Sequence, residues 1–402
     1  MSETRTARVA GRVATGASQR RLTISLYAAA TFLYWVSLYL YVPTLPTYVK
    51  SKADDLALVG VVIAMYGLWQ AIIRLPLGIA ADWLGWRKPF IVAGFMLAGL
   101  GAWIMGTAGG VDGLIVGRAI TGLAAGTWVP LVVVFNGLFP PREAVRATTL
   151  LTLLGSVGRM LATGITGSLN QLGGYSLAFF LATGAAALAI PIVLPAAEER
   201  HEPRWPSMGS VGSLLARRDV WVPSLLSAVA QYANWATTFG FIPILAQELG
   251  ATDILLSLMV SFNIGVLILG NALAAATVRR MGNQRLVYLS FGLLTLGIGT
   301  LAIAPSLPLL FLAQFCIGLS QGIGYPVLMG MSIEQVGGAE RTTAMGLHQA
   351  VYAIGMFSGP ALSGALAQAM GLRPMFGATA LACLAATLGA TRWLGRRAAI
   401  RG

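Results

Sequence analysis

The chain has 402 residues, of which 56% are hydrophobic and only 10% are charged. The apolar residues form long runs rather than amphipathic stripes, which excludes an ordinary soluble domain and indicates a polytopic membrane protein. The formal net charge of +13 would suit a nucleic-acid-binding protein, but the positions of the cations, given below, argue against that class.

A bilayer is spanned by roughly 20 apolar residues, and the sequence contains runs of that kind from end to end. They lie at about 22–45, 56–80, 89–108, 113–138, 145–168, 175–195, 220–246, 254–278, 286–305, 307–331, 342–369 and 374–394. The only long hydrophilic insert, 196–219, divides them six and six. We therefore predict an all-α membrane protein with twelve transmembrane helices. Its predicted parts are a disordered cytoplasmic tail (1–21), an N-terminal half (22–195), a cytoplasmic central loop (196–219), a C-terminal half (220–394) and a short cytoplasmic tail (395–402).

The first run is rich in aromatic residues and breaks at Pro43 and Pro46. Tyr34 and Trp35 are candidate substrate-binding residues. The alternative is that these rings belong to the aromatic belt at the membrane surface.

The second run carries Gln70 and Arg74 and leads into a short loop. The pattern Gly78-x-x-x-Asp82-x-x-Gly85-x-Arg87-Lys88 resembles the signature between the second and third helices of the major facilitator superfamily, a family of secondary transporters. The resemblance implies a conformational latch. In it, glycines let two helices approach, Asp82 faces the positive N-terminal end of a helix from the other half, and the cations bind the inner membrane surface. Trp83 departs from the family pattern, which usually has a basic residue there.

The family resemblance also implies two pseudo-symmetric six-helix halves with the substrate site between them. Repeats in the sequence agree: the segment Gly122 to Pro130 matches Gly318 to Pro326 at an offset of 196 (318 − 122). Arg118 stands before a run of small residues in the fourth helix, where the family's exporters have an arginine tied to proton relay. The Gly-Pro signature of those exporters is missing from the fifth helix, which leaves the direction of transport and proton antiport open.

Lysine and arginine residues gather on one side of the predicted membrane. With the N-terminus placed in the cytoplasm, the inner segments hold 21 of them and the outer loops hold three, Lys50, Lys52 and Arg373. This distribution follows the positive-inside rule, so both termini are predicted to be cytoplasmic and the chain to lie in the inner or plasma membrane.

Polar residues in a membrane helix should face protein or water, so their spacing indicates which helices line a pathway. In the fifth helix Thr152, Ser156, Arg159, Thr163 and Thr166 recur at steps of four and three, which is one face. Other predicted lining residues are Gln70, Asn234, Trp235, Gln321 and Tyr325. Single polar residues of this kind can also serve only to join helices.

Three arginines fall within predicted spans, Arg74, Arg118 and Arg159. Arg159 is twelve or more residues from either loop, too deep to reach the surface, and no carboxylate lies at that depth. This favours an anionic or zwitterionic amphiphile over an organic cation, which needs a carboxylate in a low-dielectric site. His348 is the best candidate for proton coupling because an ordinary histidine titrates near neutrality; the alternative is a structural histidine.

No phosphate-binding loop and no paired catalytic set occurs in the sequence, which argues against ATP-driven transport and against an enzyme. No cofactor, metal site or nucleic-acid partner is predicted. We interpret the chain as a monomeric secondary carrier that works by alternating access and exports an amphipathic or anionic small molecule with the proton gradient. The alternatives are a proton-coupled importer of a small anion or nutrient and, as the weakest, a channel.

Overall fold

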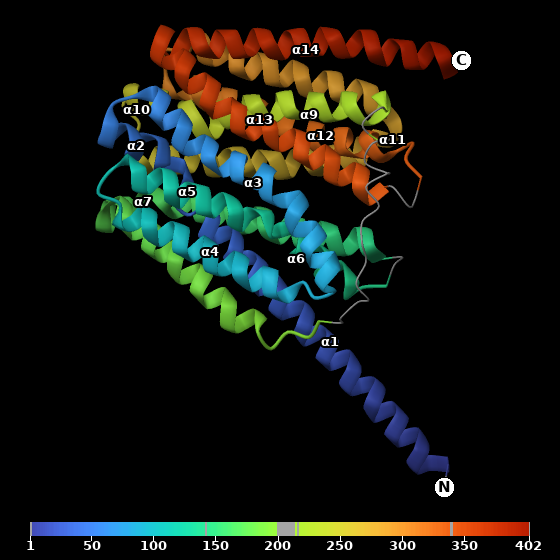
Figure 1. Ribbon diagram of the computed structural model, residues 1–402. Coiled ribbons are helices and arrows are strands. Elements are labelled where there is room, and N and C mark those ends of the chain that lie inside the picture. Colours follow the sequence, from blue (N-terminus) through green and yellow to red (C-terminus); the bar gives the residue numbers. More distant parts are fainter. Residues whose placement is uncertain (1, 141–142, 199–213, 215–216, 338–340, 402) are drawn as a thin grey trace.

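The computed structural model describes residues 2–140, 143–198, 214, 217–337 and 341–401. Within these ranges the chain is helical throughout, with no strand (Figure 1). In chain order the elements are α1 (Ser2–Tyr39), η1 (Val42–Thr44), α2 (Leu45–Ala53), α3 (Leu56–Leu84), α4 (Lys88–Thr107), α5 (Val111–Gly126), α6 (Trp128–Gly137), α7 (Ala144–Val193), α9 (Arg218–Ala236), η3 (Thr237–Phe241), α10 (Ile242–Glu248), α11 (Asp253–Ile303), α12 (Leu307–Ile333), α13 (Arg341–Met370) and α14 (Leu372–Arg401).

Nine helices of the described ranges are long and apolar enough to cross a membrane. Two of these candidates, Arg146–Val193 and Asp253–Ile303, contain 48 and 51 residues, which at about 1.5 Å per residue is more than twice the apolar thickness of a bilayer. Each of them is broken by glycines with non-helical dihedrals, at Gly173 and Gly174 in α7 and at Gly282 in α11. The predicted all-α membrane fold is confirmed, while the count of twelve spans stays a prediction.

Left-handed backbone turns mark an internal repeat. The described residues with positive φ are Asp54 and five glycines. They form three pairs, Asp54 with Gly250 (250 − 54 = 196), Gly85 with Gly282 (282 − 85 = 197) and Gly174 with Gly371 (371 − 174 = 197). These offsets lie within one residue of that of the sequence repeat, so the two halves have a positive φ at corresponding turns, which glycine adopts without strain.

Helix packing repeats in the same way. A side chain on Gly122 of α5 would collide with the backbone of Tyr66 on α3, and one on Gly318 of α12 would collide with the backbone of Asn263 on α11. In both halves, then, a small residue of the repeated segment lets two helices approach closely.

The sequence predicts a tail at each end of the chain, a disordered one at 1–21 and a short one at 395–402. The structure continues α1 as helix from Ser2 and α14 as helix to Arg401, and both chain ends lie on the same side of the bundle (Figure 1). Neither tail contains proline, and alanine and arginine, which are frequent in both, favour helix. The predicted break after the first span is found, since α1 ends at Tyr39 and η1 and α2 follow.

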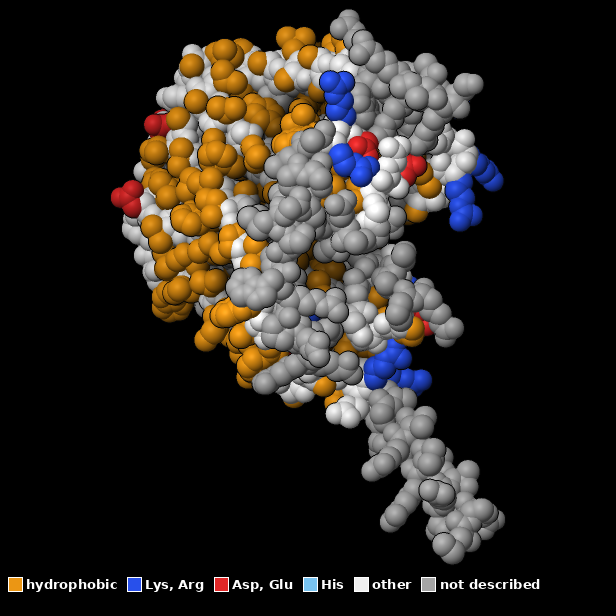
Figure 2. Space-filling view, turned by 45° about the vertical axis from the view of Figure 1, so that its right-hand side comes forward, with side chains coloured by type: hydrophobic (Ala, Val, Ile, Leu, Met, Phe, Trp, Pro, Cys, Tyr) orange, Lys and Arg blue, Asp and Glu red, His pale blue; other side chains and the backbone are white. Residues whose placement is uncertain are grey.

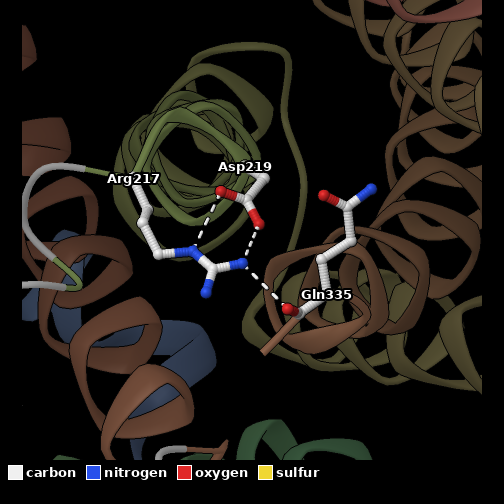
Figure 3. Close-up of polar contacts among 3 residues, drawn as sticks. All are labelled: Arg217, Asp219 and Gln335. Carbon is white, nitrogen blue, oxygen red and sulfur yellow. Dashed lines mark hydrogen bonds and ion pairs between the residues drawn. The ribbon is translucent and has the colours of Figure 1, made fainter. Parts of the chain in front are cut away.

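The central segment is held at both of its described ends. Glu198 accepts hydrogen bonds from the backbone N–H groups of Arg87 and Lys88, both at 2.7 Å, at the start of α4. At the other end Arg217 pairs with Asp219, with Nη2 2.6 Å from Oδ2, and the same Nη2 donates to the carbonyl of Gln335 at 2.8 Å (Figure 3). One end is thus joined to the N-terminal half and the other to the C-terminal half.

The surface has the character expected of a membrane protein. Hydrophobic side chains cover much of the face in Figure 2, and lysine and arginine gather toward one side of it. Arg87 and Lys88 stand at the junction of α3 and α4, Arg217 stands just before α9, Arg280 stands beside the kink at Gly282 of α11, and Arg20 of α1 contacts Leu138 just after α6. We call this the basic end of the bundle, and the turns around Asp54, Gly250 and Gly371 form the opposite end.

The contact of Glu198 gives the first testable prediction. Pro89 has no N–H, so the donors at the start of α4 are the backbone N–H groups of Arg87 and Lys88 just before it. The Glu198 carboxylate accepts from both and interacts favourably with the helix dipole. We expect Glu198→Ala to lower the free energy of unfolding by about 1–2 kcal/mol, seen as a lower melting temperature of the purified protein. Glu334→Ala, which removes an exposed acid at the end of α12, is the control. Equal melting temperatures for the two variants would contradict a stabilising role.

Candidate functional site

Arg159 of α7 lies inside the bundle and is partly exposed. Its Nη2 donates a hydrogen bond to Ser156 Oγ at 2.9 Å, while its buried Nε has no partner. The guanidinium carbon lies 4.8 Å from the ring centre of Trp35 and 5.5 Å from that of Tyr39. Aromatic faces therefore stabilise this cation where an acid would otherwise be expected.

The rings around Arg159 belong to a continuous series that crosses between the two halves, which we call the aromatic chain. Its members and ring-centre separations are Trp128–Trp35 (5.2 Å), Trp35–Tyr39 (5.7 Å), Tyr39–Phe239 (6.0 Å), Phe239–Trp235 (4.9 Å) and Trp235–Tyr66 (5.2 Å). Phe239 and Trp235 come from the C-terminal half, and the other four rings come from the N-terminal half. The sequence predicted Trp35 and Trp235 for the site but not Tyr39, Phe239 or Trp128.

Arg118 of α5 is almost completely buried, at 1% exposure. Its guanidinium carbon lies 4.3 Å from the ring centre of Tyr66, the last member of the aromatic chain, and its Nε and Nη1 have no partner. Arg118 thus lies at the Tyr66 end of the aromatic chain and is shielded from solvent, whereas Arg159 is partly exposed.

Arg74 of α3 meets the C-terminal half. Its Nη2 lies 3.4 Å from the hydroxyl of Tyr352, and its guanidinium carbon lies 5.2 Å from the centre of that ring. The ring of Tyr352 in turn lies 5.8 Å from that of Tyr325. Like Arg159, Arg74 has buried nitrogens without a partner, Nε and Nη1.

In the described part of the chain, the recorded ion pairs of acids with lysine or arginine lie near helix ends and involve none of these three arginines. No cluster of three or more His, Cys, Asp or Glu suited to a metal ion occurs among the residues searched. The interior therefore presents positive charge and aromatic surface.

His348 of α13 is fully buried, and its Nδ1 lies 3.0 Å from Ser224 Oγ of α9. Its Nε2 has no partner. An imidazolium donates from both nitrogens, so the described surroundings satisfy only one of the two donors that protonation would create.

The other predicted lining residues fall into two groups. Tyr34 and Gln321 are buried and engaged: the Tyr34 hydroxyl donates to the carbonyl of Ala124 at 2.8 Å, and Gln321 Nε2 donates to the carbonyl of Ala230 at 2.8 Å. Gln70 and Asn234 are also buried, but each has an amide oxygen without a partner. Tyr34 and Gln321 therefore join neighbouring helices. Gln70 and Asn234 each keep an amide oxygen that can still accept a hydrogen bond.

Glycine contacts show where the two halves meet. A side chain on Gly60 or Gly67 of α3 would collide with the backbone of α13, at Pro360 and at Met356 respectively. One further step along α3 Arg74 touches Tyr352 of α13, and among the described residues no atom lies within 4 Å of the position of a side-chain carbon on Gly78 or Gly346. The recorded contacts between the two helices therefore extend from Gly60 to Arg74 of α3.

Polar contacts close the opposite end. Lys50 Nζ lies 3.2 Å from Glu248 Oε1, and Asn170 Nδ2 donates to Asp253 Oδ2 at 2.8 Å, each joining one half to the other. These contacts hold the two halves together at the opposite end.

The structure describes only some of the residues of the predicted latch. Gly85 ends α3 in the left-handed conformation, with φ of 64°, as a C-terminal cap should. The side chains of Asp82 and of residues 341–343 lie outside the described ones, so the predicted contact of Asp82 with α13 stays a prediction. The sequence analysis missed Glu198, which binds the backbone of Arg87 and Lys88 in this loop; its signal was an acid just after the sixth span.

Comparison with known proteins gives one family. The model of the Major Facilitator Superfamily matches residues 27–230 and 224–401. The multidrug resistance protein MdtH of Aeromonas hydrophila is 27% identical over 316 residues, 77% of this chain and 78% of that protein. A chloramphenicol efflux pump of Mycobacterium tuberculosis is 27% identical over 177 residues, 43% of this chain and only 42% of the pump, so this match spans less than half of that relative.

Solved structures show the same fold. The crystal structure of a bacterial homologue of the human lysosomal transporter Spinster, in an inward-facing and occupied conformation, superposes with a TM-score of 0.78. The match has 14% sequence identity and covers 93% of this chain and 97% of the other.

The contact between α3 and α13 gives the second prediction. We expect Gly67→Val to force the two helices apart, at a cost of about 1–3 kcal/mol to this arrangement. A disulfide between Lys50→Cys and Glu248→Cys, which reports the closed opposite end, should then form several-fold more slowly. Gly184→Val is the control, because Gly184 is exposed and has nothing within 4 Å. Equal rates of cross-linking in the two backgrounds would contradict the assigned role of this contact.

Proposed function

The chain belongs to the major facilitator superfamily, and on that premise we propose that this secondary transporter exports an anionic, amphipathic small molecule in exchange for protons. The observation that carries the proposal is the unpaired Nε of Arg159 in an aromatic setting. A charge at that depth is costly unless something neutralises it, and a bound anion does so.

The substrate class follows from the chemistry of the same residues. A carboxylate or phosphate oxygen accepts hydrogen bonds from a guanidinium strongly, and the apolar part of a ligand packs on aromatic rings. An organic cation would find no acid beside Arg159 among the described residues and would be repelled by it.

Direction is supported by the relatives and by the charge distribution. The matched proteins include one named for multidrug resistance and one named for chloramphenicol efflux. We assign the basic end to the cytoplasm on the positive-inside rule, with both termini there and the chain in the inner membrane. With this orientation an exporter loads its substrate from the basic end.

A second candidate function is proton-coupled import of a small anion or nutrient. It is favoured by the sequence Gly155 to Gly164, which contains Arg159 but lacks the proline of the family's exporter signature. Substrate movement driven by an imposed pH gradient in vesicles of known orientation distinguishes the two, because a proton symporter and a proton antiporter move substrate in opposite directions along the same gradient.

Proton coupling is assigned to His348. Its ring lies one helical turn from Tyr352 on α13, and Tyr352 contacts Arg74 across the two halves. Because protonation creates a donor that the surroundings leave unsatisfied, the charged ring favours a movement of α13, which carries the contact with α3. Arg118 is the other candidate in the relay, through its contact with Tyr66.

Arg159 gives the third prediction. We expect Arg159→Ala to weaken binding of an aromatic carboxylate such as naphthoate by about 30-fold or more, because a desolvated charge pair is lost. Arg159→Lys should recover only part of the affinity, since an ammonium cannot form the planar two-point contact. Isothermal titration on purified protein measures both.

Arg285→Ala, which removes an exposed arginine at the basic end, is the matched control and should bind like the wild type. The corresponding naphthylmethylammonium cation should not bind measurably to any of these proteins. Unchanged naphthoate affinity in a stably folded Arg159→Ala protein would refute the anion site.

His348 gives the fourth prediction. We expect His348→Ala to abolish transport driven by a pH gradient in proteoliposomes while substrate counterflow, which needs no net proton movement, continues. Ser224→Ala, which keeps the ring but removes its hydrogen-bond partner, should retain gradient-driven transport with an altered pH dependence. Gradient-driven transport at the wild-type rate in His348→Ala would place coupling elsewhere.

A further inference from the structure

The guanidinium of Arg159 is supported by rings of a single helix, α1. Its carbon lies 4.8 Å from the ring centre of Trp35 and 5.5 Å from that of Tyr39. These two residues are one helical turn apart, and their ring centres are 5.7 Å from each other. The rings hold the cation but donate nothing to an anion, so the surroundings of the three guanidinium nitrogens decide how a ligand can reach it.

The three nitrogens of Arg159 have different surroundings. Nε is buried without a hydrogen-bond partner, and Nη2 donates to Ser156 Oγ at 2.9 Å. Nη1 has no recorded hydrogen bond and is not among the buried atoms of this side chain, which is partly exposed. The end of the guanidinium that carries Nη1 is therefore the part that a ligand can contact.

This open nitrogen distinguishes Arg159 from the other two arginines within the spans. In Arg74 and in Arg118 both Nε and Nη1 are buried without a partner. The Nη2 of Arg74 lies 3.4 Å from the Tyr352 hydroxyl, and Arg118 is only 1% exposed. Among the three, Arg159 is the one whose Nη1 remains open to a ligand.

Ser156 fixes the direction of the open end. It lies three residues before Arg159 on α7, so the two side chains share one face of the helix. Ser156 is buried, at 2% exposure, and its hydroxyl accepts from Nη2. A guanidinium is a rigid plane in which each Nη carries two hydrogens. Nη2 can therefore donate to Ser156 and still share an anion with Nη1.

We propose that Ser156 is a positioning residue for the transported anion. By holding Nη2 it directs the Nη1 end of Arg159 toward the ligand, and a carboxylate then meets the guanidinium at that end. Ser156 acts through Arg159 and does not itself touch the anion. This inference rests on the proposed function and deepens it, since it assigns a second residue to the same site.

The consequence of losing the Ser156 hydroxyl follows from this geometry. The guanidinium keeps its charge and its contacts with Trp35 and Tyr39 but is free to turn about its side-chain bonds. The ligand must then order the cation as it binds, which lowers affinity. A lysine at position 159 has no fork to direct, so the hydroxyl should matter little there.

The test is a double-mutant cycle, measured with naphthoate by isothermal titration on the purified full chain. We expect Ser156→Ala to weaken binding about fivefold or more. Ser156→Thr, which keeps a hydroxyl, should bind within about threefold of the wild type. In the Arg159→Lys background, Ser156→Ala should change the affinity by less than about twofold.

Ser168→Ala is the matched control, because Ser168 is an exposed serine of the same helix, and it should bind naphthoate like the wild type. Melting temperatures of all variants are measured alongside. A serine that only supports the fold would lower the affinity equally in the wild-type and Arg159→Lys backgrounds, so the cycle distinguishes positioning from packing.

The outcomes separate this inference from the proposed function. If Ser156→Ala binds naphthoate like the wild type, or loses the same factor in both backgrounds, the positioning role is overturned and the anion site at Arg159 stands. If Arg159→Ala also leaves the affinity unchanged, the proposed substrate class fails as well. A loss confined to the background that contains Arg159 supports the role of Ser156.

Discussion

The free-energy cost of positive charge inside a membrane constrains the interior of this protein. Arg74, Arg118 and Arg159 each lie against an aromatic ring, at 5.2, 4.3 and 4.8 Å from guanidinium carbon to ring centre. A cation–π contact contributes about 0.5–2 kcal/mol, far less than the several kcal/mol that removal of an ion from water costs. The rings therefore hold the guanidinium groups in place without neutralising them, and each group keeps at least one buried nitrogen without a hydrogen-bond partner.

The positions of these rings depend on close contact between helices. Gly67 allows α3 to touch α13 at Met356, and the adjacent Tyr66 then stacks on Trp235 from the other half at 5.2 Å. The same ring stabilises Arg118. Close packing at Gly67 is therefore linked to the surroundings of the buried Arg118. Neither Gly67 nor Met356 contacts Arg118 in any recorded interaction.

Features set by neighbouring residues in the sequence could be predicted, whereas side-chain contacts between distant helices could not. The break after the first span and the glycine turn at Gly85 follow from spacing along the chain, and the structure contains both of them. The rings that hold Arg159 come from another helix, more than a hundred residues earlier, so spacing on α7 could not identify Tyr39. Tyr34 and Trp35 are neighbours in sequence, yet Tyr34 is buried against Ala124 while Trp35 faces the guanidinium.

Alternating access requires that the two halves move against each other. Two links of the aromatic chain, Tyr39–Phe239 and Tyr66–Trp235, join the two halves. Tyr39 also contacts Arg159, and Tyr66 contacts Arg118, so the transition changes the surroundings of both cations. A ligand shifts such an equilibrium only by its differential affinity for the two states. An anion at the proposed Arg159 site would have that property if the aromatic surroundings of this charge differ between the two states.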